Sequence, residues 1–203
     1  MKTPKIDWKK NAGLVPVIVQ DAATLQVLML GYMNAAALKQ TLVTRRVTFF
    51  SRSKQRLWTK GESSKNFLHL VSLAADCDND TLLITARPDG PTCHRGTPSC
   101  FGDQGSSGAG FLAHLDQVVA GRIKSGDKTS YTVRLAREGV GRVAQKVGEE
   151  GVETALAAVT ASDQEFAGEA ADLLYHLIVL LRVKKLSLAD AIAVLEKRHA
   201  PKK

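Results

Sequence analysis

The chain has 203 residues, 44% of them hydrophobic and 24% charged, which is typical of a globular protein with one large domain or two small ones. Three cysteines argue against a disulfide framework, and no apolar run approaches the ~20 residues of a membrane span, so we expect a cytoplasmic protein with no membrane partner. The net charge of +8 comes without a long Lys/Arg tail, which favours a small polyphosphorylated substrate over nucleic acid.

The first hundred residues are predicted to be rich in β-structure, because short runs of Val, Leu, Thr and Phe recur between turn signals. One segment, Ala35–Thr44, is predicted to be helical, with Asn34 as its N-cap. The predicted strands are Leu14–Gln20, Leu25–Gly31, Val47–Ser51, Phe67–Ala74 and Thr81–Ala86.

The run from Asp76 to Asp80 interleaves ligands for two kinds of metal. In an extended segment, Asp76, Asp78 and Asp80 would line one face and Cys77 the other. Carboxylates at that spacing repel one another unless a cation lies among them, and hard oxygen ligands suit magnesium. The alternative is a solvated acidic turn.

Thiols provide a second, softer ligand set. Cys77, Cys93 and Cys100 are three thiols with no fourth, as in a zinc site that keeps an open position. Buried cysteines often serve as small core residues instead. Cys93 and Cys100 lie in a Gly/Pro-rich loop at 90–102, where a core residue would be out of place, so we favour a metal site.

Residues 104–110 have the Gly/Ser composition of a flexible linker and would separate two domains, 1–103 and 111–203. The second domain is predicted to be a four-helix bundle, which makes the whole chain α+β. Ser130 is a candidate N-cap for the second helix, and Ser162 or Asp163 for the third. The predicted helices are Phe111–Lys124, Tyr131–Thr160, Gln164–Lys184 and Leu188–His199.

Carboxylates lie on or beside the apolar stripes of two of these helices. At 100° per residue Glu150 projects within about 20° of Val143. An unpaired carboxylate in a bundle interior costs several kcal/mol, so a group of them points to bound magnesium, although a solvated acidic helix face is the alternative. The set comprises Glu149, Glu150, Glu153, Glu169 and Asp172. Lys146 and Arg142 would either meet substrate phosphates or pair with these Glu at i,i+4.

These motifs resemble two enzyme families. Segments 47–53, 58–64, 76–80 and 90–101 resemble phosphoribosyl-AMP cyclohydrolase, and segments 130–132, 146–153 and 169–172 resemble phosphoribosyl-ATP pyrophosphohydrolase. Nearly the whole chain is similar to the bifunctional histidine-biosynthesis family that fuses the two activities in this order. Such a fusion would cleave phosphoribosyl-ATP to phosphoribosyl-AMP and pyrophosphate, and then open the adenine ring between N1 and C6.

The resemblance also implies ligands and partners. Asp76, Asp78 and Asp80 would bind Mg²⁺, and Cys77, Cys93 and Cys100 would bind Zn²⁺. Members of the family are dimers whose zinc site draws cysteines from both subunits, so a homodimer is expected.

Several roles follow as hypotheses from motif position and charge. Three thiolates acidify a zinc-held water weakly, so a base is needed, and we nominate His94; the competing interpretation makes His94 a fourth zinc ligand. Glu150 is the candidate catalytic carboxylate of the helical domain, while His176 is expected to pack rather than to support the site. Arg52, Lys60, Arg95 and Lys146 would hold phosphates, and Trp58 would either stack on the base or belong to the core.

Other functions are compatible with the sequence. A general nucleotide pyrophosphohydrolase with a non-catalytic zinc domain would share the helical motif. A nucleic-acid-binding module would use the basic, aromatic stretch 45–60, and a metabolic scaffold would carry one inactive half.

Overall fold

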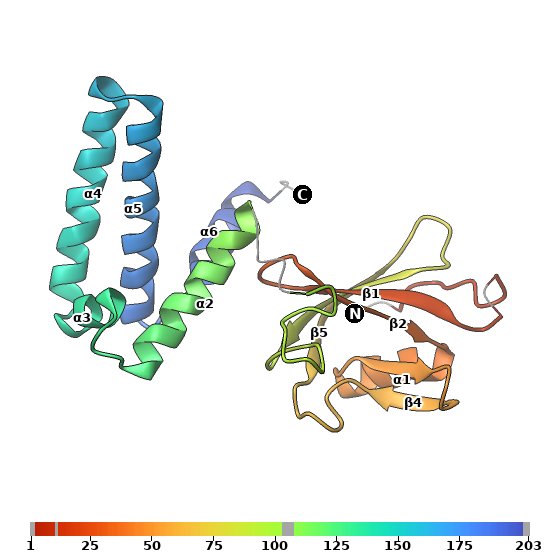
Figure 1. The fold of residues 1–203 in the computed structure, drawn as a ribbon. Coiled ribbons are helices and arrows are strands. Elements are labelled where there is room, and N and C mark those ends of the chain that lie inside the picture. Colours follow the sequence, from red (N-terminus) through yellow and green to blue (C-terminus); the bar gives the residue numbers. More distant parts are fainter. Residues whose placement is uncertain (1–2, 11, 103–107, 201–203) are drawn as a thin grey trace. The chain divides into compact units, whose positions relative to one another are not determined.

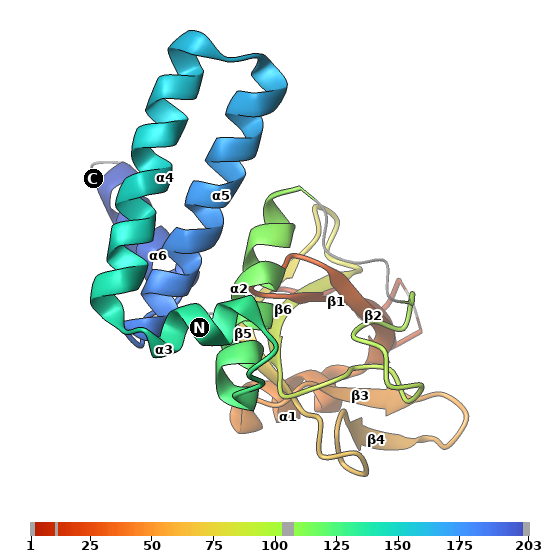
Figure 2. The same ribbon diagram turned by 60° about the vertical axis from the view of Figure 1, so that its left-hand side comes forward.

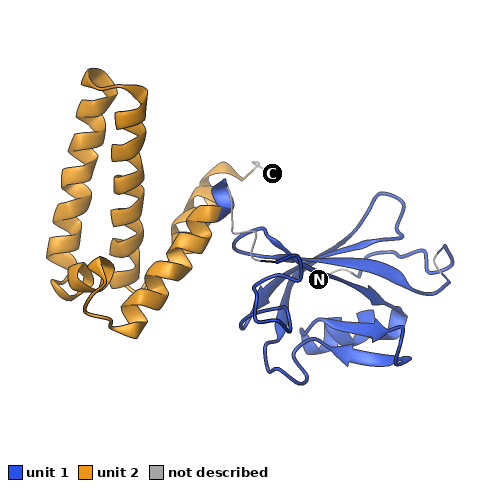
Figure 3. Cartoon of the chain, viewed as in Figure 1, with its two compact units in different colours: residues 1–110 blue, residues 111–203 orange. Residues whose placement is uncertain are grey.

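The computed structural model describes residues 3–10, 12–102 and 108–200. The chain divides into two compact units, residues 1–110 and 111–203 (Figure 3). The first unit is built mainly from strands and the second from helices, as the α+β prediction required.

The first unit is organised around a four-stranded sheet of order β2-β1-β6-β5. β1 (Val15–Asp21) pairs antiparallel with β2 (Val27–Met33) and parallel with β6 (Leu82–Pro88), while β5 (Leu68–Ala75) pairs antiparallel with β6. Val15, Val17 and Val19 alternate with partly exposed residues and are fully buried, so one face of β1 forms the core.

Helix α1 (Ala35–Thr44) and the hairpin of β3 (Thr48–Ser51) and β4 (Arg56–Thr59) lie on one side of this sheet (Figures 1 and 2). The Asn34 side chain accepts a hydrogen bond from the Ala37 N–H at 2.9 Å, which confirms the predicted N-cap. The Phe49 ring is buried against Gly31, where a Cβ atom would clash with the ring. The hairpin is therefore fixed on the sheet.

Two features of the first unit differ from the prediction. β4 was missed, because Arg56–Thr59 is a short strand without Val or Ile inside the basic, aromatic stretch 45–60. Leu25, the first residue of the predicted second strand, has φ +60° in the turn after β1, and β2 begins only at Val27. The other predicted strands are confirmed to within one or two residues at each end.

The second unit is a long antiparallel hairpin of α4 (Val140–Thr160) and α5 (Asp163–Val183) with shorter helices gathered at one end (Figures 1 and 2). The shorter helices are α2 (Ala109–Ser125), α3 (Tyr131–Arg137) and α6 (Leu188–His199). Val119, Leu135, Val143, Ile178 and Val179 form the core where these helices meet.

A buried ion pair fastens α2 to α5. Arg182 donates from Nε and Nη2 to the two carboxylate oxygens of Asp116, at 2.6 and 2.5 Å, and Asp116 is only 5% exposed. The Leu188 N–H lies 3.4 Å from the same carboxylate, so the start of α6 is tied to this pair as well.

The helical prediction was wrong in one place. Instead of a single helix over Tyr131–Thr160, the chain breaks at Glu138 and Gly139, and the described part of the unit has five helices. Gly139 has φ +90°, a conformation that only glycine adopts without strain. The predicted caps fare differently: Ser162 caps α5 in a capping box, whereas the Ser130 side chain makes no cap hydrogen bond.

The predicted linker at 104–110 falls partly on residues 103–107, which lie outside the described residues. Ala109 and Gly110 already belong to α2, so the helix starts two residues earlier than predicted. Among the described residues, every helix is too short or too polar to cross a lipid bilayer.

Candidate metal-binding and substrate-binding sites

The acidic run of the first unit forms a turn between β5 and β6, so the prediction of an extended segment with alternating faces was wrong. Oδ1 of Asp76 accepts hydrogen bonds from the N–H groups of Asp80 and Thr81, at 2.9 and 3.0 Å. The turn itself brings Asp76, Asp78 and Asp80 together, with one carboxylate oxygen of each within 4.8 Å of the others.

The electrostatics of this turn favour ionised carboxylates. Partial removal from water acts to raise the pKa of Asp76, but the N–H groups of Thr81 and Asp80 outweigh it and hold that pKa below its usual value. Asp78 and Asp80 also face a cation from a remote segment. Lys10 Nζ lies 2.7 Å from Asp78 Oδ2 and 3.6 Å from Asp80 Oδ2.

Lys10 was not singled out from the sequence, because 68 residues separate it from Asp78. Its segment is fastened to the turn by a hydrogen bond from the Asp7 N–H to the Asn79 carbonyl, at 2.7 Å. The Lys10 ammonium group lies between two carboxylates, so its position marks a place that also attracts a metal cation. Together with the all-oxygen donor set, this fits a hard divalent cation such as Mg²⁺.

The loop after β6 brings two thiols together. Cys93 is buried and Cys100 is exposed, and the two thiols interact with one another. The Arg95 N–H lowers the pKa of Cys93, while partial removal from water, together with the neighbouring Cys93, raises the pKa of Cys100. The sulfur of Cys77 does not join these two within 4.8 Å in the part of the chain that the structure describes.

His94 and Lys60 flank the thiol pair. His94 is exposed, with Nδ1 3.9 Å from the Cys93 sulfur. Lys60 is buried, and burial lowers its pKa against the opposing influence of Cys100 and Cys93. Arg95 is exposed and close enough to Cys93 to lower the pKa of that thiol by its charge.

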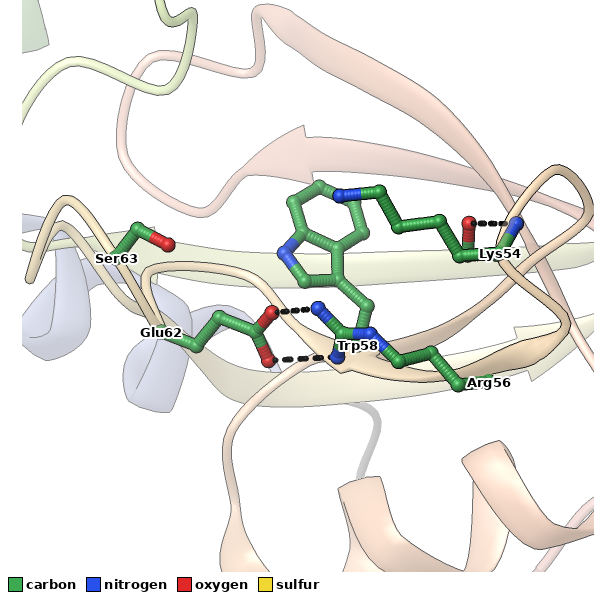
Figure 4. A pocket seen from close by; sticks show the side chains of 6 residues that line it. Lys54, Arg56, Trp58, Glu62 and Ser63 are labelled. Atoms are coloured by element: carbon green, nitrogen blue, oxygen red, sulfur yellow. Dashed lines mark hydrogen bonds and ion pairs between the residues drawn. The ribbon is translucent and has the colours of Figure 1, made fainter.

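A cavity of about 270 Å³ lies along the β3–β4 hairpin. The Trp58 indole forms part of its wall and also packs on the core, with its ring centroid 5.6 Å from that of Phe49. Arg56 and Glu62 pair across the rim, with Arg56 Nη2 2.6 Å from Glu62 Oε1 (Figure 4). The remaining lining residues are Ser51, Lys54 and Ser63, which are polar or cationic donors suited to an anionic ligand.

Arg52 lies outside the residues that line this cavity. Its guanidinium carbon is 3.8 Å from the centroid of the Tyr32 ring. This cation–π contact leaves the donors of the guanidinium plane for other partners, since the ring face accepts no conventional hydrogen bond.

In the helical unit, three of the five predicted carboxylates converge. Glu150 on α4 and Glu169 and Asp172 on α5 each place an oxygen within 4.8 Å of the others. Glu150 is only 5% exposed, and a buried carboxylate must be compensated by a cation. The all-carboxylate donor set fits Mg²⁺ here also.

The other two carboxylates flank this group. Glu149 turns to cations on its own helix, with its Oε2 2.9 Å from Lys146 Nζ, and that hydrogen bond lowers its pKa. Removal from water raises the pKa of Glu153, and so do the nearby charges of Glu150 and Glu169. Glu153 thus lies at the edge of the carboxylate group.

Lys146 bridges two of the acids. Its Nζ is 2.8 Å from Glu150 Oε1, so the i,i+4 pairing considered for this residue is present. The hydrogen bonds with Glu150 and Glu149 raise the pKa of Lys146, which keeps it cationic. Arg142 also approaches Glu149, at 3.6 Å.

Neither His176 nor Tyr131 was assigned to the site from the sequence, yet both lie beside Glu150 or its neighbours. His176 is 5% exposed, with Nδ1 3.5 Å from Glu150 Oε1 and Nε2 3.2 Å from the Tyr131 hydroxyl. The only sequence signal that could have placed His176 at the site was its i,i+4 spacing from Asp172 on one helix.

The chain thus combines a β-rich unit, which has an acidic turn and a thiol pair, with a helical unit that has a carboxylate group between two helices. Residues 29–102 match the phosphoribosyl-AMP cyclohydrolase family, and residues 112–199 match the phosphoribosyl-ATP pyrophosphohydrolase family.

Two similar proteins match this chain over most of their length. A protein named histidine biosynthesis bifunctional protein HisIE from Xylella fastidiosa is 62% identical over 196 residues, which cover 97% of this chain and 94% of that protein. The protein of the same name from Escherichia coli is 58% identical over 195 residues, with 96% of each chain covered. The chain belongs to this family of bifunctional histidine-biosynthesis proteins, and it is a hydrolase with a cyclohydrolase domain and a pyrophosphohydrolase domain.

Proposed function

We propose that each of the two activities resides in one domain and depends on that domain's own carboxylate group. Residues 111–203 would hydrolyse phosphoribosyl-ATP to phosphoribosyl-AMP and pyrophosphate, residues 1–103 would open the adenine ring of phosphoribosyl-AMP, and 104–110 would link them. The observation that carries this proposal is the presence of a separate group of three converging carboxylates in each unit.

In the helical domain, Glu150, Glu169 and Asp172 hold Mg²⁺, with Glu149 and Glu153 at the edge of the site. The cation supplies neutralisation of the charge that develops on the departing pyrophosphate. Glu150 is the candidate base, because its carboxylate is the buried member of the group. Lys146 lies beside it and pairs with Glu149 and Glu150. When a bound cation neutralises these carboxylates, Lys146 would be released to bind substrate phosphates.

In the first domain, Asp76, Asp78 and Asp80 hold Mg²⁺. Cys93 and Cys100 hold Zn²⁺ together with Cys77 of a second copy of the chain, since the three sulfurs are not grouped within the described residues of one copy. The zinc ion supplies Lewis acidity for the attack of water on the ring carbon C6. His94, adjacent to Cys93 and exposed, would take the proton from that water, and N1 would be protonated as its bond to C6 breaks.

Substrate phosphates and the base are held by residues around the hairpin and the thiol loop. Lys60 and Arg95 lie next to the thiols, Arg52 is stacked on Tyr32, and Trp58 presents one side of its ring to the hairpin cavity. The cations would compensate substrate phosphates, and Trp58 offers a stacking surface for the purine.

A homodimer is supported by apolar residues that the single chain leaves exposed. The long helices α4 and α5 expose Val152, Leu156 and Val159 on one and Phe166, Leu174 and Leu177 on the other. Val159 is 80% exposed, and α6 has no buried residue at all. Faces of this kind on a folded domain mark a surface that a second protein chain covers.

A coupled assay tests the proposal. Phosphoribosyl-ATP is supplied with Mg²⁺ and Zn²⁺, and pyrophosphate and the ring-opened product are followed together. We expect both products, loss of both after chelation, and return of pyrophosphate release alone when Mg²⁺ is restored without Zn²⁺. Pyrophosphate release from ordinary nucleoside triphosphates without ring opening would instead identify a general nucleotide pyrophosphohydrolase.

A further inference from the structure

His176 is buried beside the carboxylate group of the helical domain. It comes from α5, one turn beyond Asp172, and its ring stands edge-on to those of Tyr131 and Tyr175, with centroid distances of 6.2 and 5.2 Å. A histidine that only filled space would need a hydrogen-bond partner for each buried nitrogen, but any polar group would serve.

The partners of the two nitrogens define one tautomer of the neutral ring. Nδ1 lies 2.9 Å from the backbone carbonyl of Asp172, and a carbonyl can only accept, so Nδ1 carries the hydrogen. Nε2 of the neutral ring is then an acceptor, and the Tyr131 hydroxyl, at 3.2 Å, donates to it. The Asp172 carbonyl thus sets the tautomer, and the Tyr131 hydroxyl on α3 matches it.

The same nitrogen lies beside the acidic group. Nδ1 is 3.5 Å from Oε1 of Glu150, which is a polar contact and not a second hydrogen bond, because the one hydrogen on Nδ1 is donated to Asp172. Lys146 Nζ approaches the same Glu150 oxygen to 2.8 Å. His176 therefore contacts two members of the group, the Glu150 side chain and the Asp172 backbone. Loss of a group that orients a metal-ligating side chain typically lowers metal affinity about ten- to a hundredfold.

We infer that His176, held in one tautomer by the Asp172 carbonyl and the Tyr131 hydroxyl, is a positioning residue that orients the Glu150 carboxylate for a divalent cation in the helical domain. The inference rests on the proposed cation site of that domain. It assigns no proton transfer to His176. The ring acts through Glu150 and does not itself touch the substrate or the cation.

Calorimetric titration of the full chain with Mg²⁺ tests this inference. The part of the binding that Glu150→Gln removes is assigned to the helical site. His176→Leu should weaken that part about tenfold or more, because the polar ring edge that contacts Glu150 and binds the Asp172 carbonyl is lost while the ring volume is largely replaced. His176→Asn should restore most of the affinity, since its amide can donate from near the position of Nδ1. Tyr131→Phe should give a smaller loss, about two- to fivefold, in keeping with one lost hydrogen bond.

Controls separate the inference from the proposed function. Far-UV circular dichroism of all four variants should match that of the wild type, which shows that the helical domain is folded, and ring opening of supplied phosphoribosyl-AMP should be unchanged. If wild type and Glu150→Gln bind Mg²⁺ alike, the proposed cation site is wrong. If Glu150→Gln loses binding but His176→Leu and Tyr131→Phe keep wild-type affinity, the positioning role is wrong. Should His176→Leu unfold the helices, Tyr131→Phe and His176→Asn decide by the same criterion.

Discussion

The two carboxylate groups of this protein are built in opposite ways. In the first unit Asp76, Asp78 and Asp80 lie on an exposed turn whose geometry is set by backbone hydrogen bonds, and the nearest ammonium comes from a remote segment. In the helical unit Glu150 is buried between two helices, and its ammonium partner Lys146 is one turn away. A short local motif can thus gather ligands without a core, whereas a buried site requires two elements to pack first.

The largest expected effect comes from removing a thiol, because all three cysteines lie in the first unit. Replacing Cys93 with Ala should abolish ring opening, a loss of more than about a hundredfold, because a ligand of the proposed zinc site is removed. Pyrophosphate release from phosphoribosyl-ATP should remain at the wild-type rate. Bound zinc, measured by elemental analysis, should fall in parallel. Retention of full zinc and ring opening would show that Cys93 is not a ligand.

The sequence identified the local features of both sites but not their long-range partners. The caps at Asn34 and Ser162 were predictable because each bonds the backbone within three residues. The members of the acidic turn were predictable too. The extended geometry predicted for them was wrong, because Asn79 has φ +64° and reverses the chain.

What the sequence could not supply depended on packing between distant segments. The approach of Lys10 to Asp78 follows from the docking of the N-terminal segment, and no spacing rule spans 68 residues. The contact of His176 with Tyr131 requires α3 to be separate from α4. That separation was missed, although Gly139, with φ +90°, was its one local signal.

The second effect concerns stability and belongs to the helical unit alone. Asp116→Ala removes the partner of Arg182 and a contact of the α6 start, so the unfolding free energy of this unit should fall by about 3 kcal/mol. Denaturant unfolding followed by far-UV circular dichroism should show an earlier helical transition. Asp127→Ala, which removes an exposed acid in the same unit, provides a matched control with a much smaller change. Equal effects of the two would contradict the role of the buried pair.

A third, smaller effect tests the cation at the exposed turn. Lys10→Met removes an ammonium that competes with a divalent cation for Asp78 and Asp80, so Mg²⁺ affinity there should rise about two- to fivefold. The gain is modest because exposed charges are screened by solvent and salt. The neighbouring exposed Lys9, replaced by Met, should leave the affinity unchanged. A lower affinity in Lys10→Met would mean that this lysine supports the site instead of competing for it.

The smallest effect probes the end of the α4–α5 hairpin. Ser162→Ala removes the side chain that accepts from the Glu165 N–H in the capping box and should cost about 1 kcal/mol of helical-unit stability. Ser162→Thr, which keeps a hydroxyl acceptor, should cost less. Thermal unfolding of the two variants measures the difference, and indistinguishable midpoints would indicate that the cap contributes nothing.

The most direct test of two independent sites is to give Glu150→Gln both substrates in turn. Our account predicts that this variant releases no pyrophosphate from phosphoribosyl-ATP yet opens the ring of supplied phosphoribosyl-AMP at the wild-type rate, because the buried Glu150 belongs only to the helical site. Equal loss of both reactions, or retention of pyrophosphate release, would contradict it.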